Sequence, residues 1–249
     1  MLACQPAGIH ALHSPCREYG AHSRKLPTRG SMSKDSDVAA LAGELRAIAE
    51  ALAVAELRET DVVEATRLAT EVRRLVDGPP RERWYSAGES PHTSPAARRA
   101  YLEQSPIRGQ LNPVAPPIAL ETVTRTDGTK AVLGRVNMGL RFEGPPRGVH
   151  GGWIAALFDE VCGAAQALAG GSGVTAILKV RYRHISPLHE ELRFEGWVAE
   201  RRGRRIVAKA TCHAGDTLTA QAQAVLVDVD FREVDQQMLG RRSPEVGEG

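Results

Sequence analysis

The residues from 144 to 163, GPPRGVHGGWIAALFDEVCG, have the types and spacing of a site that could polarise a carbonyl group. Glycines and a histidine lead into residues at helical spacing, and two carboxylates, Asp159 and Glu160, follow about two turns later. The first N–H groups of a helix have no partner inside it and lie at the positive end of its dipole. Gly151 and Gly152 have no Cβ, so a ligand can approach this backbone closely. The pattern predicts a helix start that stabilises a carbonyl oxygen as it becomes negative.

Asp159 is expected on a face of this helix that does not pack in the core. The core face is predicted from apolar residues at helical spacing: Ile154, Leu157, Phe158, Val161, Ala165 and Leu168. Asp159 shares a stripe with the small residues Gly152, Ala156 and Gly163, which leave room for a ligand or a second backbone. A surface carboxylate near a capped helix start is the alternative interpretation. Glu160 lies about 100° around the helix from Asp159 and is the weaker candidate for a base.

The composition is typical of a globular protein, because 42% of the 249 residues are hydrophobic and 25% are charged. A net charge of +2 gives no overall attraction to nucleic acid, and no apolar run reaches the roughly 20 residues of a membrane span. The cysteines (Cys4, Cys16, Cys162 and Cys212) form no CxxC pair, so we expect neither a zinc site nor a disulfide framework. The N-terminus lacks the basic and apolar regions of a signal peptide. We therefore expect a cytoplasmic protein that binds neither membrane nor nucleic acid.

The N-terminal part of the chain has three predicted segments. Residues 1–36 have no apolar period and are expected to be disordered, with Met32 as an alternative start of translation. Residues 37–77 have apolar residues at helical spacing and predict a helical hairpin, with Thr60 as an N-cap. This hairpin is expected to pack on the main domain, and a partner-binding or dimerising role is the alternative. Residues 78–117 are rich in Pro, Ser and Arg and predict a linker or a flap over a site.

The apolar period becomes two in residues 118–231. The predicted strands cover residues 118–125, 130–138, 174–183, 192–200, 205–213 and 218–229, and Asp127-Gly128 is a hairpin turn between the first two. With the helix between the second and third strands, the order is ββαββββ. Six strands can bury one long helix only by wrapping around it, so we predict an α+β fold. Residues 232–249 are expected to form a disordered tail.

These features together resemble the hotdog-fold acyl-CoA thioesterases of the phenylacetate-pathway (PaaI-like) branch, in the 4-hydroxybenzoyl-CoA thioesterase superfamily. The resemblance rests on the strand order, on His-Gly-Gly at 150–152, and on Asp159 and Thr175 at the matching spacing. Glu-Gly-Pro-Pro at 143–146 and the segment 112–117 strengthen it. The resemblance covers residues 111–231 and leaves out the predicted helical hairpin.

The resemblance implies hydrolysis of an acyl-CoA thioester to a carboxylic acid and free coenzyme A. It implies that a backbone N–H of Gly151 or Gly152 holds the carbonyl, that Asp159 attacks it or activates a water, and that Thr175 positions that water or the acid. It also implies a homodimer or tetramer in which Asp159 and His150 serve one site from different subunits. Because a thioester has a good leaving group, no metal and no cofactor apart from the CoA of the substrate is expected.

Several assignments have simpler alternatives. For His150, holding the turn by bonding to backbone carbonyls is favoured over proton transfer, and Thr175 is also an ordinary strand residue. The candidates for substrate or CoA binding are Val149, Lys179, Arg181, Arg183, Arg204 and Arg205. Arginine suits phosphates, although the run 201–205 is also typical of a solvated hairpin tip. Relatives often carry an Asn or Gln before the histidine, and residues 144–149 contain neither, so the detailed mechanism stays open.

Two other functions fit parts of the sequence. A hotdog hydratase or dehydratase would use a His–Asp pair on a longer overhanging segment, which the sequence does not show. A non-catalytic acyl-CoA-binding module would use the N-terminal helices to contact a partner. A DNA-binding regulator is the least supported version, because residues 37–77 show no helix-turn-helix pattern with a basic face.

Overall fold

The computed structural model describes residues 34–79 and 95–230. The tails predicted at 1–36 and 232–249 lie outside the described residues, except that residues 34–36 already belong to the first helix. The first half of the predicted linker or flap, residues 80–94, is also outside the described residues. Its second half contains a helix, α3 (Pro95–Gln104), which the Pro-rich composition did not predict.

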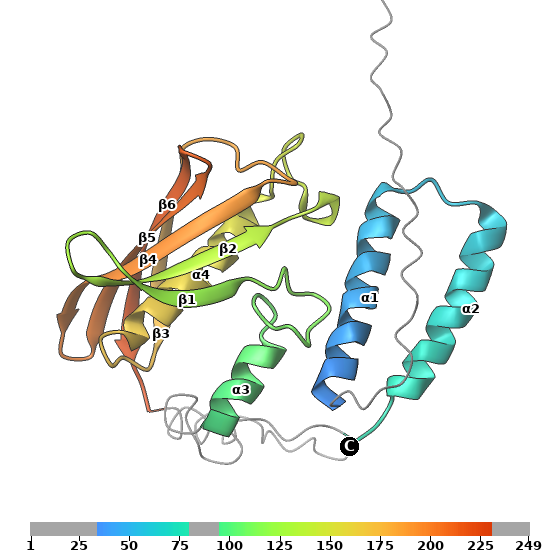
Figure 1. Ribbon diagram of the computed structural model, residues 1–249, viewed down its shortest axis with the longest axis horizontal. Helices are drawn as coiled ribbons and strands as arrows, with labels where there is room; N and C mark the ends of the chain where they lie inside the picture. The colour runs from blue at the N-terminus through green and yellow to red at the C-terminus, as the bar shows by residue number, and fades with distance from the viewer. Residues whose placement is uncertain (1–33, 80–94, 231–249) are drawn as a thin grey trace, which may run out of the picture. The chain divides into compact units, whose positions relative to one another are not determined.

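One antiparallel sheet of six strands packs against a long helix, α4 (Gly151–Ala167), as Figure 1 shows. The strands are β1 (Ala119–Thr124), β2 (Lys130–Asn137), β3 (Gly173–Tyr182), β4 (Glu191–Arg202), β5 (Arg205–Ala214) and β6 (Thr217–Asp228). Their order in the sheet is β1-β2-β4-β5-β6-β3, and every neighbouring pair is antiparallel. The predicted α+β class with a sheet around one central helix is confirmed.

The core lies between α4 and the sheet. The buried residues of α4 are Ile154, Leu157, Phe158, Val161, Cys162, Ala165 and Gln166. Five of the six predicted residues are buried, and Cys162 and Gln166 are buried in addition. Leu168 follows the last helical residue and is only half-buried. Phe158 meets Phe194 of β4 edge-to-face, with ring centroids 5.2 Å apart. At Gly196 of β4 a Cβ would lie 2.5 Å from Val161 Cγ1, so only glycine allows helix and strand to approach this closely.

A β-bulge in β3 changes which side chains face the helix. The register between β3 and β6 shifts between Thr175 and Ile177. Ala176 and Ile177 are both exposed, whereas Thr175 is half-buried like Leu178 and Val180 beyond the bulge. A regular strand would put Thr175 on the face opposite to Leu178, because side chains alternate along a strand. The bulge therefore turns Thr175 toward the side of α4.

The N-terminal segment forms two helices, α1 (Lys34–Val54) and α2 (Glu59–Val76). The prediction of Thr60 as N-cap was wrong: α2 begins at Glu59, and the cap position is Arg58, whose side chain bonds to Asp61 at 2.8 Å. The α1 carboxylate Glu50 accepts a hydrogen bond of 2.6 Å from the backbone N–H of Leu140. Leu140 belongs to a short 3-10 helix, η1 (Leu140–Phe142), that lies before α4.

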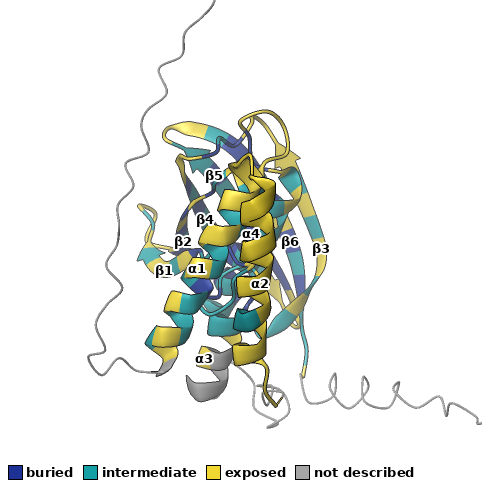
Figure 2. Cartoon of the chain, turned by 90° about the vertical axis from the view of Figure 1, so that its right-hand side faces the viewer, coloured by how far each residue is buried: buried dark blue, intermediate teal, exposed yellow. Residues whose placement is uncertain are grey.

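The two helices differ in their packing. α1 contributes Glu50 and Arg46 to contacts with the segments before β1 and α4. No residue of α2 is buried, and Figure 2 shows this helix almost wholly in the colour of exposed residues. None of the helices in the described parts of the chain combines the length and apolar character that a membrane span requires.

Candidate active site

A hollow of about 650 Å³ runs along α4 and contains Asp159 and Thr175. Its other lining residues are Tyr101, Leu102, Arg108, Leu120, Glu121, Thr122, Val132, Glu160, Gly163, Ala164, Gln166, Ala167, Leu168, Gly173, Val174 and Leu226. β1 and β3, the two edge strands of the sheet, both border it. Asp159 and Thr175, which the resemblance assigned to one site, thus line the same hollow.

Asp159 is an exposed residue of this hollow. Its side chain is exposed, while Leu157 and Phe158 beside it are fully buried in the core. Of the predicted stripe of small residues, Gly163, one turn further along α4, also lines the hollow, whereas Gly152 and Ala156 do not. A carboxylate here can reach a ligand without leaving the helix.

The start of α4 is held by a tight turn over residues 143–149. Glu143 and Val149 form an isolated antiparallel bridge, and the N–H of Gly148 donates to Pro145 O at 2.8 Å. Arg147 has a positive φ of 60°, and its N–H donates to the Glu143 carboxylate at 2.8 Å. The Glu-Gly-Pro-Pro segment therefore shapes the turn that aims the first amides of α4.

His150 is the N-cap of α4. Its ring Nδ1 accepts a hydrogen bond of 3.0 Å from the backbone N–H of Gly152. The N–H of His150 donates to Phe142 O at 2.8 Å. The ring was expected to hold the turn by bonding to backbone carbonyls. It instead accepts the amide proton of Gly152 and caps the helix. An accepting Nδ1 places the ring proton on Nε2.

The cap separates the roles of the two glycines. The Gly152 N–H is engaged by His150, whereas the Gly151 N–H has no acceptor among the described residues. The Gly151 carbonyl accepts a hydrogen bond of 2.8 Å from the hydroxyl of Tyr182 in β3. Of the two amides predicted to hold a carbonyl, Gly151 is the one with a free proton.

The helix start and Asp159 are too far apart to act on one carbonyl within a single chain. Gly151 and Asp159 are separated by about 12 Å along the helix axis, at 1.5 Å per residue. His150, Gly151 and Gly152 do not line the hollow that contains Asp159. The helix start and Asp159 therefore lie in separate places on α4.

This chain is similar to proteins of one family. Residues 148–221, which include the start of α4, Asp159 and Thr175, match a family model described as thioesterase superfamily. A solved crystal structure of a thioesterase superfamily protein is similar to 80% of this chain and 96% of its own, with 26% identity and a TM-score of 0.62. The sheet and α4 have the hotdog fold, and the matched residues are similar to the thioesterase superfamily. The similarity to the 26% identical structure covers more of the chain than residues 118–249 contain. It therefore also includes residues before β1.

Two further solved structures are similar to this chain over a smaller share. A thioesterase superfamily protein from Shewanella loihica PV-4 has 27% identity over 45% of this chain and 91% of its own, with a TM-score of 0.37. Zebra fish thioesterase superfamily member 2 has 18% identity over 44% of this chain and 81% of its own, with a TM-score of 0.39.

The hotdog domain has a cluster beside Asp159 that sequence reasoning missed. Glu160 accepts a hydrogen bond of 2.9 Å from Ser105 Oγ, and Arg108 Nη1 lies 4.0 Å from its other oxygen. Burial raises the pKa of Glu160. Burial and the negative charges of Glu160 and Asp159 raise the pKa of Tyr101 to about 12. No local pattern in the sequence connects residues 101–108 with α4, because the contact joins distant parts of the chain.

The candidate CoA-binding residues do not form one cluster in the hotdog domain. The side chain of Val149 is only 4% exposed and packs in the core, so only its backbone could contact CoA. The basic residues (Lys179, Arg181, Arg183, Arg204 and Arg205) are all exposed. Arg205 pairs with Val227 near the start of β3, whereas the Arg183 N–H donates to Thr219 O beyond its other end. Val227 also pairs with Val174 of β3, which lies nine residues before Arg183, or about 30 Å at 3.3 Å per residue. Within one chain, a single phosphate therefore cannot contact both Arg205 and Arg183.

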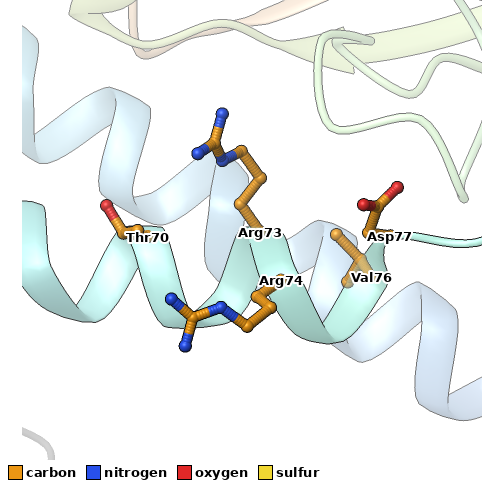
Figure 3. A pocket seen from close by; sticks show the side chains of 5 residues that line it. All are labelled: Thr70, Arg73, Arg74, Val76 and Asp77. Atoms are coloured by element: carbon orange, nitrogen blue, oxygen red, sulfur yellow. The ribbon is translucent and has the colours of Figure 1, made fainter.

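A second hollow, of about 540 Å³, lies at the end of α2. It is lined by Thr70, Arg73, Arg74, Val76 and Asp77, shown in Figure 3. Arg74 is exposed and forms an ion pair of 3.0 Å with Glu71. No residue of the hotdog domain lines this hollow, so we do not assign the chemistry to it.

The described cysteines are not placed as nucleophiles. Cys162 and Cys212 are buried, and burial raises the pKa of the first to about 12 and of the second to about 11. A reactive thiol needs the opposite shift. Within residues 34–79 and 95–230, no three His, Cys, Asp or Glu side chains form a group that could hold a metal ion.

Proposed function

We propose that this protein hydrolyses an acyl-CoA thioester to a carboxylic acid and free coenzyme A. The observation that carries the proposal is the hollow on α4 of a thioesterase-superfamily domain, where Asp159 and Thr175 lie together. The hollow offers a carboxylate and a hydroxyl to a ligand that reaches α4. These are the groups needed to activate or position a water beside a carbonyl carbon.

The proposed reaction uses three groups of the chain. The N–H of Gly151, at the positive end of the α4 dipole, donates to the thioester oxygen and stabilises its negative charge in the transition state. Asp159 takes a proton from a water molecule held by Thr175, and the water oxygen bonds to the carbonyl carbon. The C–S bond then breaks, and the proton passes to the leaving thiolate of CoA. In the alternative route Asp159 attacks the carbon itself, and water hydrolyses the resulting anhydride.

A second copy of the chain supplies the missing half of each site in this proposal. β3 ends the sheet, so one of its edges has no neighbouring strand among the described residues. Its exposed side chains include Val174, Ile177 and Tyr182, at 44%, 49% and 53% exposure. A long exposed edge strand with apolar residues favours pairing with another strand.

Pairing of β3 with the β3 of a second copy would bring the half-sites together. Antiparallel pairing about a two-fold axis places the Thr175 end of one strand beside the Tyr182 end of the other. Tyr182 is bonded to Gly151 in its own chain. The Asp159 and Thr175 of one copy would then lie near the Gly151 amide of the other.

The test is release of free thiol from acyl-CoAs ranging from acetyl to palmitoyl, with phenylacetyl and benzoyl included. We expect Asp159→Asn to lower kcat by about 10²-fold or more, because it removes the base or nucleophile. Asp216→Asn, at an exposed turn of the same domain, is the matched control and should keep full activity. A wild-type protein that binds these compounds but releases no thiol would contradict the proposal and favour a non-catalytic acyl-CoA-binding module.

A further inference from the structure

One side of the hollow on α4 is formed by residues 101–108, the end of α3 and the turn after it. Tyr101, Leu102 and Arg108 line the hollow together with Asp159. We call residues 101–108 the wall segment. It lies outside the sheet and α4, so its sequence can differ without a change in the helix that carries Asp159.

The wall segment is fixed to α4 through one serine. Ser105 is 4% exposed, and its Oγ donates to Glu160 Oε1 at 2.9 Å. The same Oγ accepts the backbone N–H groups of Ile107, at 3.3 Å, and Arg108, at 3.2 Å. The hydroxyl thus shapes the turn of the wall segment and ties it to the helix.

Arg108 adds a second link between the wall segment and Glu160. Its Nη1 lies 4.0 Å from Glu160 Oε2, and the two side chains are only 16% and 14% exposed. Ion pairs this well covered are weakly screened by solvent. Glu160 is therefore held on both oxygens by the wall segment, one residue away from Asp159.

The far side of the wall segment is also braced. The Gly109 N–H donates to Ser105 O at 3.0 Å, and a Cβ on Gly109 would lie 2.5 Å from Glu103 O, so this tight turn requires glycine. Arg46 of α1 donates to Asn112 O at 3.0 Å. The wall segment is consequently a fixed boundary of the hollow.

We propose that the wall segment limits the length of the acyl group, with Leu102 and Tyr101 as specificity-determining residues and Glu160 as the positioning residue that holds them through Ser105 and Arg108. The proposal rests on the proposed function, because it treats the hollow beyond Asp159 as the acyl site. The substrate class it names is an acyl-CoA of short or medium chain length. Glu160 does not act as base here, since both of its oxygens are engaged.

The first experiment compares kcat/KM along a series of straight-chain acyl-CoAs from C2 to C16. Leu102→Ala should raise the ratio of dodecanoyl-CoA to butanoyl-CoA hydrolysis by about tenfold or more, because a few added methylene contacts are worth this much. Leu102→Phe should shift the ratio in the opposite direction. Leu68→Ala, on exposed α2, is the matched control and should leave the profile unchanged.

The second experiment tests Glu160 and Ser105 as the anchor. Ser105→Ala should broaden the chain-length profile by changing KM for long acyl-CoAs, with kcat for butanoyl-CoA kept within about threefold. Ser105→Thr retains the hydroxyl and should restore the wild-type profile. A residue that only supported the fold would lower activity on every substrate alike, without this selective change in KM.

An unchanged dodecanoyl-to-butanoyl ratio in folded Leu102→Ala and Leu102→Phe would overturn the inference, even if Ser105→Ala failed to fold. Failure of the proposed function gives a different result, because the wild type would then hydrolyse no member of the series. In that case the same variants are compared by calorimetric binding of the acyl-CoAs. A binding preference that does not respond to Leu102 would overturn the inference independently of catalysis.

Discussion

The start of α4 and its middle carry the two halves of the proposed chemistry, and the chain holds them in place by different means. At the start, a turn over 143–149 and the His150 ring fix the first amides through local backbone contacts. In the middle, the surroundings of Asp159 come from a bulged edge strand and from the wall segment, both distant in sequence. The amide half should therefore respond to changes in backbone donors, and the carboxylate half to changes in long-range packing.

The largest effect at the start of α4 is expected from removing the Gly151 N–H. Proline is tolerated at the first position of a helix and has no N–H, so Gly151→Pro removes the donor with little change to the helix. We expect kcat to fall by about 10²- to 10³-fold, as for loss of one oxyanion donor. Steady-state thiol release measures it.

Gly151→Ala is the matched variant, because it keeps the N–H and adds only a methyl group. Its Cβ would lie 3.3 Å from Tyr182 Cζ, a contact that a small shift of the ring relieves. Equal losses in the Pro and Ala variants would show that space, and not the N–H, is what this position supplies.

A smaller effect is expected from His150→Ala, which removes the cap of the same helix. Loss of an N-cap acceptor should lower the free energy of unfolding by about 1 kcal/mol. Urea unfolding followed by circular dichroism measures this change. A cap role predicts that kcat falls by less than in Gly151→Pro, whereas a larger fall would assign proton transfer to the ring.

The smallest effect concerns the middle of α4 and its dependence on pH. Burial raises the pKa of Glu160 in the folded protein, so ionisation of this group opposes folding as the pH rises through and above 4.5. Glu160→Gln cannot ionise, and its free energy of unfolding relative to wild type should increase from pH 4 to pH 8. Urea unfolding at several pH values measures the trend.

Glu64→Gln on α2 is a control for this trend with the opposite sign. The side-chain hydrogen bond from Arg67 lowers the pKa of Glu64, so ionisation favours the folded state there. The free energy of unfolding of Glu64→Gln relative to wild type should therefore decrease as the pH rises above 4.5. If the free energy of unfolding relative to wild type changed with pH in the same direction in both variants, burial would not be what sets the pKa of Glu160.

The sequence predicted the features that depend on nearby residues. Helical spacing separated Asp159 from the core face, and strand alternation together with helical spacing gave the ββαββββ order and the α+β class. The start of α2 was misplaced by two positions, because the cap residue Arg58 makes no side-chain cap hydrogen bond that a capping preference could have indicated.

The missed features depend on contacts between distant residues. The bulge between Thr175 and Ile177 interrupts a sequence that alternates without a break, so no local pattern indicated it. The bond from Ser105 to Glu160 joins a Pro-rich segment to the central helix. As a candidate base, Glu160 was placed after Asp159 because of its helical position alone. The wall segment, which binds both carboxylate oxygens of Glu160, has no periodic pattern that would have indicated this contact.

The most direct test of a site shared between two copies is complementation between Asp159→Asn and Gly151→Pro chains. Each variant alone should be almost inactive, and the two are mixed under conditions that exchange subunits. A mixed dimer has one site with an intact Asp159 from one chain and an intact Gly151 from the other, so statistical mixing should restore about a quarter of wild-type activity. Mixed dimers that form, shown by tags on the two chains, but recover no activity would contradict a shared site.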